Sequence, residues 1–260
     1  FHLPKTHQYY MNYQNKTIVI TGAAKGIGAA CAKVFLEAGA NVGLLDIDVI
    51  SPTDSEQSMS VVCDVSDENA VKNAIHEIKN HFGSVDYLIN NAGIQRYGSV
   101  TETSSDDWDL VMNVNLKSFF LCAKYAIPFM LESKKGVVIN IASVQAFVSQ
   151  QNVSAYTTAK TAILGLTRSI AVDYAPLIRC VAVCPGTIDT PMLRDAINLS
   201  PDPAAVMEEC IEMHLTKRIG TPEEVAELVK YLCDDKSSFI TGQAFRIDGG
   251  LGITIAGSKK

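Results

Sequence analysis

The stretch KTIVITGAAKGIG, residues 16–28, decides the fold of this chain. Its first part, Lys16–Thr21, is a run of mostly β-branched residues that favours a buried strand, and it passes directly into a loop with three glycines. Apolar residues then repeat at helical spacing until Gly39 provides a stop signal. This order points the first amide N–H groups of a helix at the end of the strand, where anions bind. The alternative is a tight turn without a ligand.

We expect this loop to hold the pyrophosphate of a dinucleotide. Its glycine spacing, G-x-x-x-G-x-G, differs from the G-x-G-x-x-G pattern found in many dinucleotide-binding proteins. The residues of the loop that are predicted to bind the cofactor are Gly22, Lys25, Gly26, Ile27 and Gly28.

An acidic residue after the second predicted strand bears on the choice of cofactor. Asp46 ends the strand Asn41–Asp46, 18 residues beyond Gly28. A carboxylate in this place accepts hydrogen bonds from the ribose hydroxyls of adenosine, and its charge repels a 2′-phosphate. Lys25 acts in the opposite direction, because a basic side chain in the loop can meet such a phosphate. We give Asp46 the greater weight and predict NAD, with NADP less favoured. The alternative is that Asp46 only opens a polar loop.

Strands and helices alternate through the rest of the chain. Further strands are predicted at residues 59–63, 85–89, 137–141, 178–183 and 244–247, and helices at 70–82, 105–132, 155–174, 204–215 and 221–233. Because no linker interrupts the alternation, we predict an α/β fold, a doubly wound, Rossmann-type sheet of about seven parallel strands with helices on both faces. This single domain spans residues 16–260. Residues 1–15 are predicted to be a tag remnant, or an N-terminal extension ahead of a native start at Met11.

Ligands of such sheets bind at the carboxyl ends of the strands, and several candidate residues follow those ends. Asp64-Val65 comes after the third strand, where the acid is placed to bond the adenine amino group. Asn91-Ala92-Gly93 comes after the fourth, where small residues let the backbone approach a flat ligand; a plain turn is the alternative. The irregular segment 187–219 follows the sixth strand and is a candidate lid over the site.

The segment 139–160 is predicted to carry out proton transfer. Tyr156 and Lys160 are four residues apart, so on a helix they lie one turn apart on the same face. An ammonium group beside a phenol favours the phenolate and lowers the pKa of the phenol. Lowering that pKa from about 10 to about 7 requires roughly 4 kcal/mol, so a second positive charge, such as an oxidised nicotinamide, would contribute. Ser143, at the end of a predicted strand, is placed to hold a substrate oxygen against the phenol. The alternative is a solvated helix face.

Composition excludes several other classes of protein. The formal charge of −6 at pH 7 disfavours nucleic-acid and anionic-membrane partners, which leaves small molecules. The seven cysteines include no C-x-x-C and the five histidines no H-x-x-x-H, so neither a metal site nor a disulfide framework is predicted. No apolar run approaches the length that spans a bilayer. We therefore expect a cytoplasmic protein.

Together, these motifs resemble those of the short-chain dehydrogenase/reductase family. TGAAKGIG at 21–28 is similar to the cofactor loop of that family, and NNAG at 90–93 to its next signature. The resemblance covers about residues 16–250, and the interval of 13 residues from Ser143 to Tyr156 is the usual one in the family. It implies a catalytic tetrad made of Asn115, Ser143, Tyr156 and Lys160. It also implies cofactor contacts from Pro185, Gly186, Ile188 and Thr190, and from Tyr156 and Lys160 themselves.

The resemblance implies an ordered path for the proton. Tyr156 exchanges the proton with the substrate, Lys160 lowers the pKa of Tyr156 and binds the nicotinamide ribose, and Ser143 positions the reacting oxygen. Asn115 would link Lys160 to solvent through water. An amide inside a helix otherwise points to water, bonds the backbone or joins a buried polar network. Hydride passes directly between the substrate carbon and the nicotinamide, so no metal is required.

The substrate is predicted from two segments, 142–147 and 169–194, which are similar to those of family members that oxidise aldohexoses at C1 to the lactone. Gln95 and Gln145 are predicted to contact the sugar together with Ser143 and Tyr156, unless the two glutamines are solvated loop residues. The rival enzyme is a 3-oxoacyl-thioester reductase or another hydroxy-compound dehydrogenase. A reductase of that kind would need NADPH and a basic patch, of which this acidic chain gives little sign. A non-catalytic nucleotide sensor is a third possibility, which an intact tetrad disfavours.

The long predicted helices 105–132 and 155–174 carry more apolar surface than one sheet face needs. The resemblance implies that these helices pair across a dimer. The expected assembly is a homotetramer built as a dimer of dimers.

Overall fold

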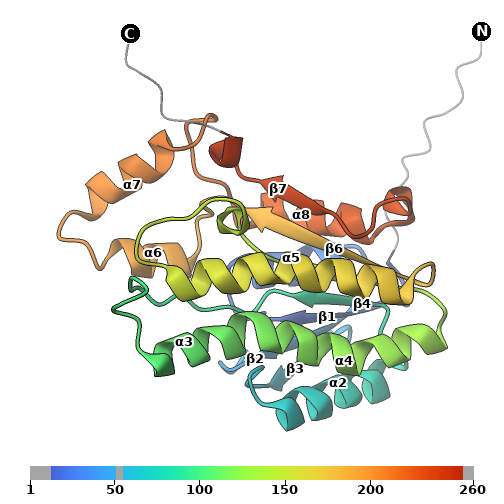
Figure 1. Cartoon of the computed structure of the whole chain (residues 1–260). Helices are drawn as coiled ribbons and strands as arrows, with labels where there is room; N and C mark the ends of the chain where they lie inside the picture. Colours follow the sequence, from blue (N-terminus) through green and yellow to red (C-terminus); the bar gives the residue numbers. More distant parts are fainter. Residues whose placement is uncertain (1–12, 51–54, 254–260) are drawn as a thin grey trace, which may run out of the picture.

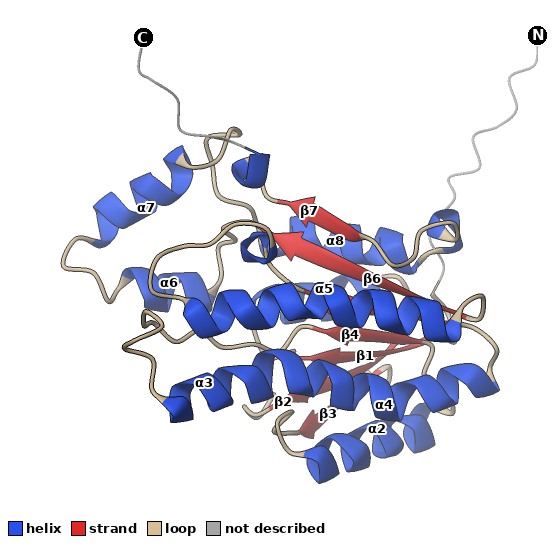
Figure 2. Ribbon diagram, viewed as in Figure 1, coloured by secondary structure: helices blue, strands red, loops and turns tan. Residues whose placement is uncertain are grey.

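One parallel sheet organises the computed structural model, which describes residues 13–50 and 55–253. Its seven strands follow the order β3-β2-β1-β4-β5-β6-β7 (Figure 2). Their bounds are β1 (Thr17–Thr21), β2 (Asn41–Asp46), β3 (Ser58–Val62), β4 (Tyr87–Asn90), β5 (Gly136–Ile141), β6 (Ile178–Pro185) and β7 (Ala244–Ile247). The chain starts in the middle of the sheet, winds out to β3 and then crosses back to β4. The reversal between β1 and β4 opens a crevice at the carboxyl ends of these two strands.

Helices cover both faces of the sheet, as predicted. Their bounds are α1 (Gly26–Glu37), α2 (Glu68–Phe82), α3 (Ser105–Met112), α4 (Ser118–Glu132), α5 (Ser154–Tyr174), α6 (Pro191–Ile197), α7 (Pro203–Glu212) and α8 (Pro222–Cys233). Helices α2, α4 and α5 lie in front of the sheet in Figure 1, and α1 and α8 pack together on the opposite face. The predicted single α/β domain of Rossmann type is therefore confirmed.

Side chains that alternate along the central strands build a core on each face. Ile18 and Ile20 of β1 pack in the cluster that includes α1 and α8, whereas Val19 packs in the cluster that includes α2 and α4. Each fully buried side chain of this size contributes about 1.5–3 kcal/mol to the free energy of unfolding. Because both faces are covered, β1 is buried at every position, and its three central residues, Ile18, Val19 and Ile20, are all apolar.

The long helix predicted at 105–132 is divided by a π-helical segment. Residues Asn113–Lys117 form this segment between α3 and α4, with backbone hydrogen bonds that span one residue more than in an α-helix. Hydrophobic periodicity does not reveal such a change, because the apolar face continues on both sides. The π-helical segment lies beside the cleft described below.

The N-terminal boundary predicted from the sequence needs a correction. Residues 1–12, including Met11, lie outside the described residues, but Tyr13 is only 2% exposed. Its ring packs edge-on against Phe35 and Tyr87, and its hydroxyl donates to the carbonyl oxygen of Lys230. Tyr13 therefore belongs to the core of the domain, and the predicted extension does not run as far as residue 15.

The predicted lid, residues 187–219, contains two short helices at the carboxyl ends of the strands (Figure 1). Thr190 caps α6 and Asp202 caps α7, and in each case a proline occupies the first helical position. Proline fits this position because its missing N–H has no partner there. The sequence predicted only the second of these helices, at 204–215.

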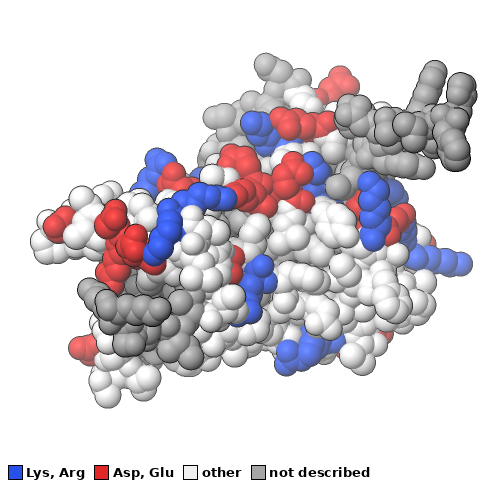
Figure 3. Space-filling view, turned by 90° about the horizontal axis from the view of Figure 1, so that it is seen from above, with Lys and Arg blue, Asp and Glu red and all other residues white. Residues whose placement is uncertain are grey.

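The described residues include no helix that is long and apolar enough to cross a membrane. Figure 3 shows acidic and basic side chains mixed over one face of the molecule rather than gathered by sign. Within the described ranges, no group of three or more His, Cys, Asp or Glu residues is arranged to hold a metal ion.

Candidate active site

One large cleft lies at the carboxyl ends of the strands. Its volume of about 1150 Å³ exceeds the roughly 300–1,000 Å³ of common ligand pockets. The predicted site residues that line it are Gly22, Lys25, Gly26, Ile27, Asp46, Asp64, Val65, Asn91, Ala92, Gly93, Gln95, Ser143, Gln145, Tyr156, Lys160, Pro185, Gly186, Ile188 and Thr190. Only Gly28 and Asn115 are predicted site residues that do not line the cleft. Residues from all parts of the chain thus meet in one place.

The glycine loop has the geometry of an anion cradle. Gly22 has a φ of +63°, and a Cβ atom there would lie 2.8 Å from the Cα of Ala92. A Cβ atom at Gly28 would lie 2.0 Å from the carbonyl oxygen of Gly22, so Gly28 lets α1 approach the loop and is not itself a ligand-facing residue. Lys25, the N-cap residue of α1, makes no side-chain cap. The first amide N–H groups of α1 are therefore left for an anion.

Asp46 lies between the glycine loop and the turn after β2. Its Oδ2 accepts a 2.9 Å hydrogen bond from the backbone N–H of Ala24, and its Oδ1 accepts a 3.0 Å bond from that of Asp48. The ammonium of Lys25 lies 3.3 Å from the carboxylate of Asp48. The basic residue that favoured NADP in the sequence is thus paired with an acid, and the negative charge of Asp46 remains at the cleft wall.

Asn91 joins the two strands that flank the crevice. Its side-chain Nδ2 donates to the carbonyl oxygens of Thr21 and Gly22, at 3.0 and 2.9 Å. The backbone N–H groups of Asn91 and Ala92 both donate to the hydroxyl of Thr21. The side chain of Asn91 thus stabilises the glycine loop, and the competing explanation of a plain turn does not account for these bonds.

Lys160 is buried beneath the aromatic ring of Tyr156. Its Nζ donates a 2.9 Å hydrogen bond to the carbonyl oxygen of Ile141 and lies 5.6 Å from the centre of the Tyr156 ring. It is also 5.4 Å from the centre of the Phe119 ring. The lysine side chain is only 3% exposed, whereas the tyrosine side chain is partly exposed in the cleft. The two residues share one helix face, as predicted, and the solvated alternative is wrong.

Asn115 lies in the π-helical segment and is fully buried. Its Oδ1 accepts from the backbone N–H of Ile94 and its Nδ2 donates to the carbonyl oxygen of the same residue, both at 2.8 Å. A Cβ atom at Gly93 would lie 3.4 Å from Asn115 Oδ1 and 3.6 Å from Lys160 Nζ. Asn115 therefore holds the backbone of the loop that separates it from Lys160. Of the alternatives given for this amide, the structure shows the one in which the side chain bonds the backbone.

The predicted lowering of the pKa of Tyr156 does not arise from the protein's own groups. Burial disfavours the charged phenolate and raises the pKa of Tyr156 to about 12, and hydrogen bonding to Ser143 offsets this only in part. Burial also lowers the pKa of Lys160 to about 8, because the desolvated ammonium is costly. The sequence reveals the spacing of the pair but not its burial, so the prediction was wrong for the protein alone. A proton transfer by Tyr156 near neutral pH therefore requires a further positive charge beside the phenol, such as that of an oxidised nicotinamide.

The substrate end of the cleft carries more amide groups than predicted. Gln95 and Gln145 line the cleft, and Gln145 also bonds Thr157 at 3.2 Å and Gln150 at 3.4 Å. Gln150, Gln151 and Asn152, which the sequence reading missed, line the same wall. Three consecutive amides just before the catalytic helix were the available signal. Ser143 is buried, and its hydroxyl accepts a 3.1 Å bond from the backbone N–H of Gln145.

The outer wall of the cleft is apolar. It is formed by the loop after β4 and by the lid, through Tyr97, Met192, Leu193, Leu199, Val206 and Met213. None of these residues was predicted to line the site. Helix α6 was not predicted from the sequence, and an apolar helix face usually packs in a core rather than against a cleft. Here the lid presents these side chains to the cleft.

A cradle for a dinucleotide and a tyrosine above a buried lysine in one cleft define a nicotinamide-dependent oxidoreductase. Comparison with known proteins agrees. A family model described as enoyl-(acyl carrier protein) reductase matches residues 22–252. Dehydrogenase/reductase SDR family member 6 of Danio rerio is 40% identical over 237 residues, which are 90% of this chain and 96% of that protein. The chain belongs to the short-chain dehydrogenase/reductase family.

Two solved structures show the same fold over nearly the whole chain. The ligand-free aldohexose dehydrogenase of Thermoplasma acidophilum has a TM-score of 0.91 and 40% identity, and the match covers 96% of this chain and 99% of that one. Levodione reductase has a TM-score of 0.89 and 32% identity, with 94% and 100% of the two chains covered. Members of this family use NAD or NADP and act on small molecules.

Proposed function

We propose that this enzyme oxidises the C1 hydroxyl of an aldose sugar to the lactone with NAD. The observation that carries the proposal is the set of amides on the cleft wall near Tyr156, made of Gln95, Gln145, Gln150, Gln151 and Asn152. An amide both donates and accepts hydrogen bonds, which matches the hydroxyls of a sugar. The likeness to an aldohexose dehydrogenase supports the same substrate class.

The cleft fits the cofactor at both ends. The uncapped start of α1 suits the pyrophosphate, and the carboxylate of Asp46 suits the adenosine ribose. Its negative charge, with Lys25 held by Asp48, favours NAD over NADP. Pro185 and Gly186 would border the nicotinamide end, near Lys160. The bound dinucleotide supplies the hydride acceptor and, when oxidised, a positive charge that favours the phenolate of Tyr156.

The protein's own residues bind the substrate oxygen and accept the proton of the C1 hydroxyl. Ser143 holds the substrate oxygen, and Tyr156 as a phenolate removes the proton of the hydroxyl while the C1 hydrogen leaves as hydride. One proton and one hydride leave the substrate, which becomes the lactone. Lys160 stabilises the phenolate from beneath the ring, and Asn115 fixes the loop beside Lys160 through Ile94.

Purified protein given NAD and a panel of aldoses, polyols and 3-hydroxyacyl thioesters tests this function. We expect NADH to form with a hexose or pentose and to require a free C1 hydroxyl, so that the methyl glycoside of the same sugar is inactive. Formation of NADH with only the polyols or thioesters would contradict the proposal. Cofactor binding without turnover of any compound would instead support a nucleotide sensor.

A 3-oxoacyl-thioester reductase is the second candidate, and the apolar lid favours it. Tyr97, Met192, Leu199 and Met213 would accommodate an acyl chain better than a sugar. The charge at Asp46 disfavours the NADPH that such a reductase would need. Consumption of NADPH with an acetoacetyl thioester, faster than any aldose oxidation, would replace the first proposal by this one.

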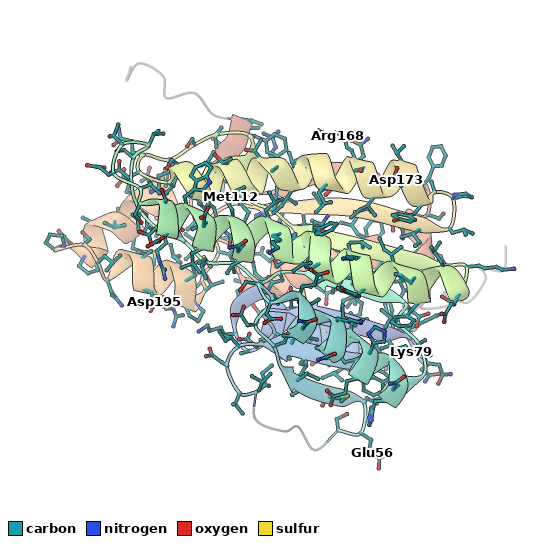
Figure 4. The ribbon with its side chains drawn as sticks, turned by 60° about the horizontal axis from the view of Figure 1, so that its bottom comes forward. Glu56, Lys79, Met112, Arg168, Asp173 and Asp195 are labelled. Carbon is teal, nitrogen blue, oxygen red and sulfur yellow. The ribbon has the colours of Figure 1, made fainter. Side chains whose placement is uncertain are left out.

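We also propose a homotetramer that works in the cytoplasm. All seven cysteines are unpaired, six of them buried, which suits a reducing compartment. Helices α4 and α5 lie side by side on one face of the molecule, with Arg168 and Asp173 on α5 (Figure 4). Phe120 on α4 and Val172 on α5 are 49% and 79% exposed. Such apolar side chains on neighbouring helices support pairing with a second copy.

A further inference from the structure

We propose that His214 is a positioning residue that fixes the loop after β6 to the lid. His214 follows α7 and is only 2% exposed, and nothing in the proton path described above involves it. The proposal rests on the proposed function, because Pro185 and Gly186 are assigned there to the nicotinamide end of the cleft, and Thr187 follows them and lines the same cleft. Here the loop comprises residues 185–187, and the lid is the rest of the segment, residues 188–219.

Both ring nitrogens of His214 are engaged, and their partners lie on opposite sides. Nδ1 lies 2.6 Å from the carbonyl oxygen of Cys210, within the lid. Nε2 lies 3.2 Å from the backbone nitrogen of Thr187, which belongs to the loop. A carbonyl can only accept and a backbone N–H can only donate, so these partners assign the neutral ring with its proton on Nδ1. The ring thus forms a bridge of two hydrogen bonds between lid and loop.

The loop is shaped to receive this ring. A Cβ atom at Gly186 would lie 2.9 Å from His214 Nε2, so a side chain there would displace the histidine. The adjacent ring atom packs against Gly249 after β7, where a Cβ atom would lie 3.2 Å from His214 Cδ2. The carbonyl oxygen of Thr187 accepts a 2.9 Å bond from the N–H of Gly220. Thr187 is therefore held through both of its backbone polar groups, and His214 supplies one of the two bonds.

This arrangement couples cofactor and lid. Cys210 and Met213 line the outer wall of the cleft, while Gly186 and Thr187 line its inner end. A displacement of the lid therefore moves the His214 ring through its bond to Cys210, and the movement of the ring alters its hydrogen bond with the N–H of Thr187. Loss of the bridge leaves the partly buried N–H of Thr187 without its acceptor and frees the loop to move. The expected consequence is weaker binding of the dinucleotide.

Two substitutions separate the bridge from simple packing. In His214→Asn, the shorter amide reaches the carbonyl of Cys210 but not Thr187, whereas the longer amide in His214→Gln reaches the N–H of Thr187. We expect the asparagine variant to bind NADH about tenfold more weakly and the glutamine variant within about twofold of the wild type. Hydrogen exchange at the Thr187 amide should accelerate in the asparagine variant only. NADH fluorescence and exchange detected by mass spectrometry measure these quantities without any substrate.

His76 on α2 provides the matched control. Its Nδ1 lies 2.7 Å from the carbonyl oxygen of Lys72, four residues earlier, as His214 Nδ1 does with Cys210, but it is remote from the cleft. His76→Asn should leave NADH affinity and Thr187 exchange unchanged. Equal NADH affinity in the two His214 variants, or wild-type exchange at Thr187 in His214→Asn, would overturn the proposal. If no aldose is a substrate, the proposed function is wrong. NADH affinity and hydrogen exchange at Thr187 would still test the role of His214, because neither measurement needs a substrate.

Discussion

At the scale of residues, burial governs the pKa values of Tyr156 and Lys160. The spacing of Tyr156 and Lys160 correctly predicts that they share a helix face near Ser143. It does not predict that Lys160 is buried beneath the ring, where its carbonyl and aromatic neighbours only partly replace water. The spacing of two residues in the sequence predicts that their side chains are neighbours, whereas their exposure to water depends on the whole fold. This is why the direction of the pKa change of Tyr156 was missed.

The low pKa of Lys160 predicts a pH-dependent stability. Between about pH 8 and pH 10.5, Lys160 binds a proton in the unfolded chain but not in the folded one. Its contribution to the free energy of unfolding therefore rises with pH in this window and is smallest below about pH 8. The free energy of unfolding of Lys160→Met relative to the wild type should thus fall by roughly 2–3 kcal/mol from pH 7 to pH 10, because most of the window between the folded pKa of about 8 and the unfolded value of 10.5 is then crossed.

Urea unfolding at several pH values measures this difference. Using the difference between variants removes the contribution of Cys31, Cys122 and Cys233, whose pKa values are raised by burial in both proteins alike. Lys33→Met, at an exposed position on α1, is the control and should show no such change. A constant difference between Lys160→Met and the wild type would mean that the lysine is not destabilised by burial.

Cofactor choice is predicted to depend on the charge of Asp46. Asp46→Asn keeps an oxygen that can accept from the N–H of Ala24 but removes the charge that repels a 2′-phosphate. The ratio of kcat/KM with NADP to that with NAD should rise by about tenfold. Initial rates with both cofactors on the same substrate measure it. An unchanged ratio would reduce Asp46 to a residue that only shapes the turn at Asp48.

At the scale of elements, the sequence predicts regular strands and helices better than departures from them. Short apolar runs mark the central strands β1 and β2, and α8 (Pro222–Cys233) lies within the predicted helix 221–233. The π-helical segment Asn113–Lys117 has no such mark, because its side chains suit an α-helix equally well. Helix α6 lies in the segment 187–219, which the sequence indicated to be irregular, and its Pro191 occupies the first helical position.

The π-helical segment is predicted to be essential through Asn115. Asn115→Ala leaves the partly buried N–H and carbonyl of Ile94 without these partners, which should lower the free energy of unfolding by about 1–3 kcal/mol. Turnover should fall as well, because the loop next to Lys160 loses its support. Asn113→Ala in the same segment is the control, since Asn113 is not fully buried. Equal effects of the two substitutions on unfolding and turnover would contradict the role given to Asn115.

At the scale of the whole molecule, the exposed surface of α4 and α5 predicts an assembly. Light scattering at micromolar concentration should give about four times the chain mass of 28.1 kDa. Val172→Glu, at a side chain that is 79% exposed, should break one interface and leave a smaller species, because burying the new charge is costly. Val100→Glu, at an 83% exposed valine in the loop before α3, should not change the mass. A monomeric wild type would remove the assembly proposal.

The topology of the molecule brings the glycine loop, the catalytic pair and the lid to one end of the sheet, although they lie far apart in sequence. This convergence could be predicted because ligands of doubly wound sheets bind where the strands end. The shape of the outer wall could not, because it depends on how α6 and α7 are placed over the cleft.

The proton path is tested most directly by Tyr156→Phe, measured by turnover and by NADH binding in parallel. The substitution removes the hydroxyl and keeps the ring above Lys160. Turnover should fall by about 10²–10⁴-fold, the usual contribution of a positioned acid or base, while the dissociation constant for NADH stays the same. A turnover close to that of the wild type would show that Tyr156 does not transfer the proton.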